Sequence, residues 1–222
     1  MYLYAEMKQL LVKDTISKLF PDFNKSKEFI DELLQVGSIV ELEAGVKVVD
    51  AGEYIKTIPF LMDGLIKIYR EDDFGNEILL YYINSGESCV ISITASLKDE
   101  KSSIKAIVEE DSKLLGVPTR EFVNLLSKYN LLHTFTYDLF NIKYNELIKS
   151  IDSLAFSNMG TRLMQYLVNE ANLKNSKQIS GLTHKGIAKD LSTSREVISR
   201  QLNALQKDGK IAIKNKIITL MD

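Results

Sequence analysis

Residues 183–202 constrain the fold of this chain more than any other stretch. Apolar residues recur there at the spacing of a short helix, which Thr183 can cap and which we expect to end near Leu191. A second helix is predicted to begin at Thr193, because Glu196 follows three residues later at the spacing of a capping box. Two short helices joined by so tight a turn predict a helix-turn-helix.

The second of these helices separates polar from apolar residues. On a helical wheel, its polar residues fall within an arc of roughly 140°, and its apolar residues lie on the far side. The polar residues are Arg195, Glu196, Ser199 and Arg200, and the apolar ones are Ile198, Leu202 and Leu205. Arginine can donate two hydrogen bonds to guanine and glutamate can accept one from cytosine, so this face suits the DNA major groove. The alternative is a solvated face with an ion pair between Glu196 and Arg200.

Basic residues flank this helix on both sides. His184 and Lys185 open the first helix, from where they can reach a DNA phosphate. Residues 207–220 follow the pattern of a turn, a strand, a tip and a second strand. This pattern predicts a β-hairpin, or wing, with the basic residues Lys214 and Lys216 at its tip.

The net charge of the whole chain is −2 and does not by itself suggest a nucleic-acid partner. Residues 156–222, however, hold 11 lysines and arginines against 5 acidic residues, a net charge of +6. Residues 1–155 carry the other 17 basic and 25 acidic residues, a net charge of −8. A basic C-terminal third on an acidic body is expected when only one domain faces phosphates.

Composition sets the remaining bounds. At 222 residues the chain can bury a full core in one or two domains, and its 45% hydrophobic content is typical of a soluble globular protein. It has no apolar run of about 18 residues and no signal-peptide core. The single cysteine rules out an intramolecular disulfide framework. We therefore expect a cytoplasmic protein without a membrane segment.

The N-terminal half is predicted to be helical first and then rich in strands. Residues 1–36 are expected to form N-terminal helices, because residues 6–36 have helical periodicity in two pieces, broken at Pro21. In residues 37–118, short β-rich runs alternate with glycines at the spacing of an antiparallel barrel or jelly roll, and residues 72–76 form a hairpin loop. The eight expected strands are Ser38–Leu42, Val46–Val49, Thr57–Leu61, Leu65–Tyr69, Glu77–Ile83, Cys89–Ile93, Ser103–Val108 and Lys113–Val117. The fold class is thus α+β, with an N-terminal double-sheet β-barrel.

Residues 119–156 return to helical periodicity, with a short helix over Glu121–Tyr129 and a long one over Leu131–Ala155. Four apolar residues of the long helix keep the 3-4 spacing of a coiled-coil seam. They are Leu132, Phe135, Leu139 and Ile142. The helix either covers its own barrel or forms a two-fold dimer seam, and we favour the dimer because the helix is too long for the barrel alone. Residues 158–160 are interpreted as a hinge into the DNA-binding domain, residues 157–222.

In this order and at this length, the barrel, long helix, hinge and winged helix resemble the Crp/Fnr family of bacterial transcription regulators over nearly the whole chain. The motifs that carry the resemblance are Leu154-Ala155-Phe156, Gly160-Thr-Arg-Leu-Met-Gln-Tyr-Leu167 and, above all, Leu182–Leu202. The resemblance implies base-reading or phosphate contacts for Ser194, Arg195, Glu196 and Arg200, and DNA-backbone contacts for Thr183, His184 and Lys185. It also implies RNA polymerase as a partner.

A cupin-type enzyme is the strongest enzymatic alternative for such a barrel, and the sequence argues against it. That chemistry needs clustered histidine and carboxylate ligands on barrel strands. The two histidines, His133 and His184, instead lie on predicted helices outside the barrel. An iron–sulfur cluster would need about four thiolates. We therefore expect no enzyme, no metal and no cofactor.

The resemblance implies a sensor in the barrel, but the cyclic-nucleotide pattern is broken. The family's pocket uses a Gly-Glu pair and a later Arg-Ser/Thr-Ala segment, whose arginine neutralises the cyclic phosphate. Here the glutamate position reads Ile91, and the arginine segment begins at Lys101. An unknown small-molecule effector is therefore expected rather than cyclic AMP. The candidate pocket residues are Glu87, Ser88, Cys89, Ser102, Ser103, Leu147 and Ile148.

Two hypotheses of function follow from the sequence. The favoured one is a homodimeric regulator of transcription that binds a palindromic site in double-stranded DNA. The alternative is a ligand-binding or protein-interaction module with vestigial DNA affinity. Within either, Cys89 is a thiol sensor or, as we favour, a small buried hydrophobic residue.

Overall fold

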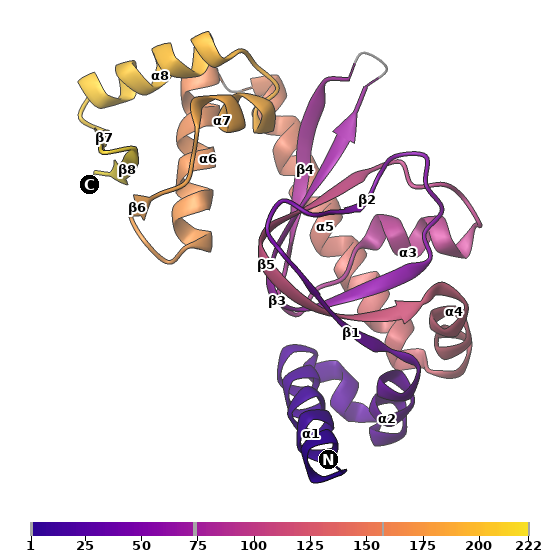
Figure 1. The fold of residues 1–222 in the computed structure, drawn as a ribbon. Helices are drawn as coiled ribbons and strands as arrows, with labels where there is room; N and C mark the ends of the chain where they lie inside the picture. The colour runs from indigo at the N-terminus through magenta and orange to yellow at the C-terminus, as the bar shows by residue number, and fades with distance from the viewer. Residues whose placement is uncertain (1, 73–74, 157, 222) are drawn as a thin grey trace. The chain divides into compact units, whose positions relative to one another are not determined.

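The structure, a computed structural model, describes residues 2–72, 75–156 and 158–221, and the side chains of 10–72, 75–151 and 158–221. The chain divides into two compact units, which are described one at a time (Figure 1). Unit 1 comprises Met1–Arg70 and Leu80–Glu146, and unit 2 comprises Glu71–Leu79 and Leu147–Asp222. No helix in the described part of the chain is long and apolar enough to span a membrane.

Unit 1 begins with helical segments, and the first break between them lies at Pro21, as predicted. Helix α1 (Tyr2–Leu19) is followed by the 3-10 helix η1 (Pro21–Lys25), which has Pro21 at its start, and then by α2 (Lys27–Val36). The Ser26 hydroxyl caps α2 by accepting a hydrogen bond of 3.1 Å from the Phe29 N–H. The apolar sides of these segments join the core of unit 1, where Phe23 and Phe29 are fully buried.

The β domain of unit 1 contains one antiparallel five-stranded sheet in the described residues. Its strands are β1 (Ser38–Leu42), β2 (Lys47–Val49), β3 (Thr57–Glu71), β4 (Glu77–Asn84) and β5 (Lys105–Pro118). The order is β1-β5-β3-β4, and β2 also pairs with β5, so the two long strands β3 and β5 form the middle of the sheet (Figure 1). The predicted α+β class with an N-terminal β domain is confirmed, but the described residues form five strands in place of the eight short strands predicted.

A β-bulge explains two of the missing boundaries. The register between β3 and β5 shifts three times between Leu61 and Ile66, so each strand bends without ending. Gly64 lies there with a φ of +95°. A Cβ atom at this position would lie 2.2 Å from the Ser112 Oγ, so the bend requires glycine. The sequence pattern treated this glycine as the end of a strand.

The expected strand Cys89–Ile93 is a helix instead. Helix α3 (Val90–Leu97) begins after Cys89, whose Sγ accepts a hydrogen bond of 3.4 Å from the Ser92 N–H. Its Val90 and Ile93 side chains are buried in the core of unit 1. Packing of these side chains therefore overrides the β propensity of the sequence. In the expected hairpin loop 72–76, residues 73 and 74 lie outside the described part of the chain.

Two helices follow the sheet, α4 (Thr119–Lys128) and the long α5 (Asn130–Phe156). The apolar residues predicted for a dimer seam do not form one. Leu132 and Leu139 are buried in the core of unit 1, Phe135 packs against that core, and only Ile142 is exposed. The first half of α5 therefore uses this stripe to cover its own β domain. The side chains of the motif 154–156 lie outside the described residues.

Unit 2 holds a helix-turn-helix with a small sheet. Its elements are α6 (Met159–Leu173), β6 (Gln178–Ile179), α7 (His184–Asp190), α8 (Arg195–Lys207), β7 (Ile211–Lys214) and β8 (Ile217–Leu220). The antiparallel strands have the order β6-β8-β7. The wing was predicted, whereas β6, with two residues, is too short to give a periodic signal. The segment interpreted as a hinge begins α6, and the Asn158 side chain caps it by accepting from the Thr161 N–H at 3.0 Å.

Candidate functional site

The helix-turn-helix is built from α7 and α8, and capping side chains fix both helix starts. The Thr183 hydroxyl accepts from the Gly186 N–H at 3.0 Å, as predicted. The capping residue of α8 lies one position later than predicted, because the Ser194 hydroxyl is the cap and accepts from the Val197 N–H at 3.2 Å. The Thr193 N–H instead donates to the Ala188 carbonyl and closes α7, so Thr193 is not the cap.

Helix α8 has the two faces that its sequence indicates. Ile198 and Leu202 are fully buried and Leu205 is 5% exposed, all within the core of unit 2. Arg195, Glu196 and Arg200 are exposed, and Ser199 is half-buried. Glu196 and Arg200, both within the described part of the chain, form no ion pair with each other. The exposed Arg200 guanidinium is therefore not held by Glu196.

Hydrogen bonds organise the start of α8. The His184 Nδ1 lies 2.8 Å from the Ser199 Oγ, which links α7 to α8. The Ser199 hydroxyl also donates to the Arg195 carbonyl at 2.9 Å. The Glu196 backbone N–H and then the Ser194 hydroxyl hold the pKa of the Glu196 carboxyl below its ordinary value. Glu196 is therefore a carboxylate acceptor at neutral pH.

The wing presents two lysines beside a tight turn. Asn215 and Lys216 have φ values of +51° and +63°, which form the two-residue turn that joins β7 to β8. Lys214 and Lys216 are exposed at this tip, and Lys185 is exposed at the start of α7. Unit 2 thus carries exposed positive charge on α7, on α8 and at the tip of its wing.

Polar contacts hold α7 in place, and no pattern in the sequence indicated them. The Tyr166 hydroxyl of α6 donates to the Asp190 Oδ2 at 2.8 Å, and both residues are buried. The Arg162 guanidinium, also on α6, donates to the Leu191 carbonyl at 2.8 Å. In residues 71–79 of unit 2, the Glu77 carboxylate pairs with Lys189 at 2.5 Å. These contacts support the helix pair from within unit 2.

Unit 1 contains a cavity of about 680 Å³ in its β domain, which is partly open to solvent. Most of its lining is aliphatic, and its charged residues are three lysines and one glutamate. The residues that line it are Val40, Leu42, Val46–Val49, Gly52–Thr57, Pro59, Ile66, Ile83, Cys89, Ser92, Lys101, Ala106 and Leu114. A volume of this size suits a small organic molecule.

Of the seven predicted pocket residues, Cys89 lines this cavity. The Ser102 hydroxyl is used within the chain, since it donates to the Ile104 carbonyl at 2.8 Å, and the Ser103 carbonyl accepts from Arg70. Ser88 is fully buried, and its Oγ has no hydrogen-bond partner among the described residues. Leu147 and Ile148 belong to unit 2 and are described with it. Contact of a ligand with any of these residues remains a prediction.

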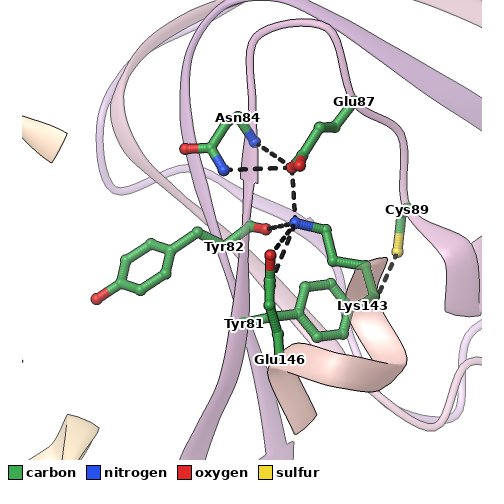
Figure 2. Close-up of polar contacts among 7 residues, drawn as sticks. All are labelled: Tyr81, Tyr82, Asn84, Glu87, Cys89, Lys143 and Glu146. Atoms are coloured by element: carbon green, nitrogen blue, oxygen red, sulfur yellow. Dashed lines mark hydrogen bonds and ion pairs between the residues drawn. The ribbon is translucent and has the colours of Figure 1, made fainter. Parts of the chain in front are cut away.

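Glu87 belongs to a different cluster, centred on Lys143 of α5 (Figure 2). The Lys143 ammonium donates to the Glu87 carboxylate at 2.7 Å and to the Tyr82 carbonyl at 2.8 Å. It also pairs with Glu146 at 3.2 Å. The Lys143 side chain is 1% exposed, which is exceptional for a lysine. No pattern in the sequence indicated a role for this residue.

The described residues contain no group of three or more His, Cys, Asp or Glu side chains arranged to hold a metal ion. The structure does contain a helix-turn-helix with exposed arginines in unit 2, and a β domain with a partly open cavity in unit 1. These features define a DNA-binding protein with a separate domain for a small molecule.

Comparison with known proteins agrees with this class. Residues 39–129 match the cyclic nucleotide-binding domain, and residues 161–222 match the Crp-like helix-turn-helix domain. The cAMP-activated global transcriptional regulator Vfr of Pseudomonas aeruginosa is 24% identical over 184 residues, which cover 78% of this chain and 84% of Vfr. The global nitrogen regulator of Synechococcus elongatus is 25% identical over 195 residues, 83% of this chain and 86% of that protein.

A solved structure shares the fold. The crystal structure of a transcriptional regulator assigned to the Crp/Fnr family, from Eubacterium rectale, has a TM-score of 0.82 at 19% sequence identity and covers 92% of this chain and 95% of its own. The chain belongs to the Crp/Fnr family of transcription regulators, which are not enzymes. It binds DNA through its helix-turn-helix and carries an effector-binding domain.

Proposed function

We propose that this chain is a homodimeric regulator of transcription that recognises a palindromic DNA site, one half-site for each copy. The observation that carries the proposal is the exposed face of α8, with Arg195, Glu196 and Arg200 opposite the buried Ile198 and Leu202. In this arrangement the N-terminal part of α8 enters the major groove, and two copies contact half-sites about one helical turn apart.

The exposed side chains divide into two roles. Arg195 and Glu196 contact bases, and Arg200 contacts a base or the adjacent phosphate. The other contacts position the protein on the DNA backbone without reading sequence. These positioning residues are Thr183, His184, Lys185, Ser194, Ser199, Lys214 and Lys216. Ser199 acts through its neighbours, because its hydroxyl is bonded to the Arg195 carbonyl and lies against His184.

The second copy is proposed to bind along the exposed side of α5. Tyr137, Phe140 and Tyr144 are 74%, 49% and 53% exposed, and they repeat at a spacing of three and then four residues. The rings of Phe140 and Tyr144 stack with their centroids 6.5 Å apart. The same spacing continues along the helix at Ile148 and Ile151, which are also exposed. Apolar residues at this spacing are typical of a helical dimer seam.

The cavity of unit 1 is the proposed effector site, and cyclic AMP is not the effector we favour. The helix α3 position where the family's glutamate is expected holds Ile91, whose side chain packs on the core. The lining described here supplies lysines but no arginine to bind a cyclic phosphate. We also propose that the protein is cytoplasmic and that RNA polymerase is a partner. The proposed domain boundaries lie after residues 36, 118 and 156.

The test is selection of bound fragments from a random DNA library by the full-length protein, with the mass of the complex measured by analytical ultracentrifugation. The proposal predicts an inverted repeat bound by two copies, with affinity that falls steeply as salt rises. A bound sequence without internal symmetry, or a complex with one copy, would contradict it.

A further inference from the structure

Lys143 occupies a position on α5 where the packing calls for an apolar residue. Leu132, Leu139 and Lys143 fall within about 40° of one another on a helical wheel. Both leucines are buried in the core of unit 1, and Lys143 is equally buried, at 0% exposure. A buried ammonium is costly unless every N–H has an acceptor, so its retention at this position requires an account.

The ammonium group is fully satisfied. Its three N–H donors meet the Glu87 carboxylate at 2.7 Å, the Tyr82 carbonyl at 2.8 Å and the Glu146 carboxylate at 3.2 Å. It also lies over the Tyr81 ring, 5.5 Å from the centroid. Glu146 is on α5 itself, whereas Tyr82 and Glu87 are not. Lys143 therefore joins α5 to the end of strand β4 and to the turn that follows it (Figure 2).

That turn, residues 85–89, leads directly to the cavity. Glu87, in the middle of this segment, is fixed to the end of β4, because its Oε2 also accepts from the Asn84 N–H at 2.8 Å. Two residues later, Cys89 lines the cavity, and its Sγ lies 3.9 Å from the Tyr81 hydroxyl. The same short segment thus lines the cavity through Cys89 and contacts Lys143 through Glu87.

We propose that Lys143 is a positioning residue that couples the cavity of unit 1 to helix α5. An occupant of the cavity that displaces Cys89 moves Glu87, and the charge-assisted bonds of Lys143 transmit that movement to α5. Apolar contacts alone would allow the turn and the helix to shift past each other, whereas these directional bonds hold them together. The purpose of the coupling rests on the proposed effector role of this domain, but the coupling itself is measurable without DNA.

The single cysteine of the chain provides a specific probe. Methyl methanethiosulfonate converts the Cys89 thiol to a small methyl disulfide with release of methanesulfinate, which places an adduct in the wall of the cavity. Hydrogen–deuterium exchange followed by mass spectrometry then reports on residues 136–150 of the full-length protein. We expect the adduct to change exchange there in the wild type. The change should be much smaller in Lys143→Met and of wild-type size in Lys149→Met, an exposed lysine on the same helix.

A second readout separates coupling from mere support of the fold. Removing Lys143 should let the turn open more often, so Cys89 in Lys143→Met should react roughly tenfold faster or more. The double variant Lys143→Met with Glu87→Gln removes the charge left in the turn. It should regain thermal stability while the response of α5 to the adduct stays absent.

Three results would overturn the proposal. The first is unchanged exchange in residues 136–150 of fully modified wild-type protein, an experiment that needs no variant to fold. The second is an equal change in the wild type and in Lys143→Met. The third is recovery of the α5 response together with stability in the double variant. None of these results depends on DNA binding, so they leave the proposed function to its own test.

Discussion

Helices α8 and α5 distribute charge in opposite ways. Helix α8 keeps Arg195 and Arg200 in solvent and buries its apolar residues. Helix α5 buries Lys143 and exposes aromatic residues such as Tyr137 and Tyr144. An amphipathic helix with its charged face in solvent is stabilised by packing its apolar face on the core of its own domain. A helix with a buried charge and an exposed aromatic stripe fits the further roles proposed for α5, which are dimer contact and coupling to the cavity.

The difference indicates that charged residues have different roles on the two helices. On α8, the exposed charges are proposed to contact DNA, and they contribute little to folding. On α5, charge is part of the structure, since Lys143 is bonded to three groups of unit 1. Four substitutions test this contrast.

Replacing the buried lysine should have the largest effect. Lys143→Met leaves Glu87 and Glu146 without their shared cation, and we expect the free energy of unfolding of unit 1 to fall by about 3–5 kcal/mol. The matched change Arg200→Met on α8 should alter stability by no more than about 0.5 kcal/mol, because Arg200 is exposed. Urea denaturation of both variants is the measurement. Equal losses would remove the contrast between the two helices.

The exposed stripe of α5 gives the next prediction. Tyr144→Glu places a carboxylate in the proposed seam of each copy, and we expect the dimer to weaken by at least about 2 kcal/mol. Asn145→Glu, exposed on the same helix but about 100° away, serves as the control. Sedimentation equilibrium gives the dissociation constants. A Tyr144→Glu protein as dimeric as the control would move the interface away from this face.

The cap of α8 gives a smaller effect. Ser194→Ala removes the hydroxyl that accepts from the Val197 N–H, and the expected loss of stability in unit 2 is about 1 kcal/mol. The same substitution should raise the pKa of Glu196 towards its ordinary value, because that hydroxyl helps to lower it. NMR titration measures the pKa directly. Thr193→Ala should change neither quantity, and the reverse result would restore Thr193 as the cap.

The smallest effect is expected at the start of α7. Lys185→Ala should weaken DNA binding evenly across sequences and reduce the slope of log affinity against log salt by about 1. Fluorescence anisotropy at several salt concentrations, with matched and scrambled DNA, is the measurement. A loss confined to the matched DNA would make Lys185 a reader of bases and not a phosphate contact.

The sequence predicted most of unit 2 because its signals there are local. Thr183, the buried residues of α8 and the basic wing each act within a few residues of the chain. The prediction erred at Thr193 because the choice between two neighbouring capping residues depends on which N–H closes α7. Strand β6 depends on pairing with β8, which a two-residue segment cannot indicate.

Unit 1 was less predictable because its decisive interactions are not local. The bulge at Gly64 depends on the approach of Ser112 from another strand. Helix α3 forms where β-branched residues favour a strand, because Val90 and Ile93 are buried against the core. On α5 the buried and exposed faces both carry apolar residues, so spacing alone could not assign them. Lys143 is separated from Glu87 by 56 residues, and no sequence pattern connects the two.

The exposed face of α8 is proposed to read DNA bases, and substitution of Arg195 is the sharpest way to check this role. Binding energies for every single-base change in the selected site should be measured for the wild type and for Arg195→Ala. We expect the variant to lose about 1–3 kcal/mol, with its preference abolished at one symmetry-related position in each half-site and retained elsewhere. An unchanged set of base preferences in Arg195→Ala would contradict the assignment of this face as the reader.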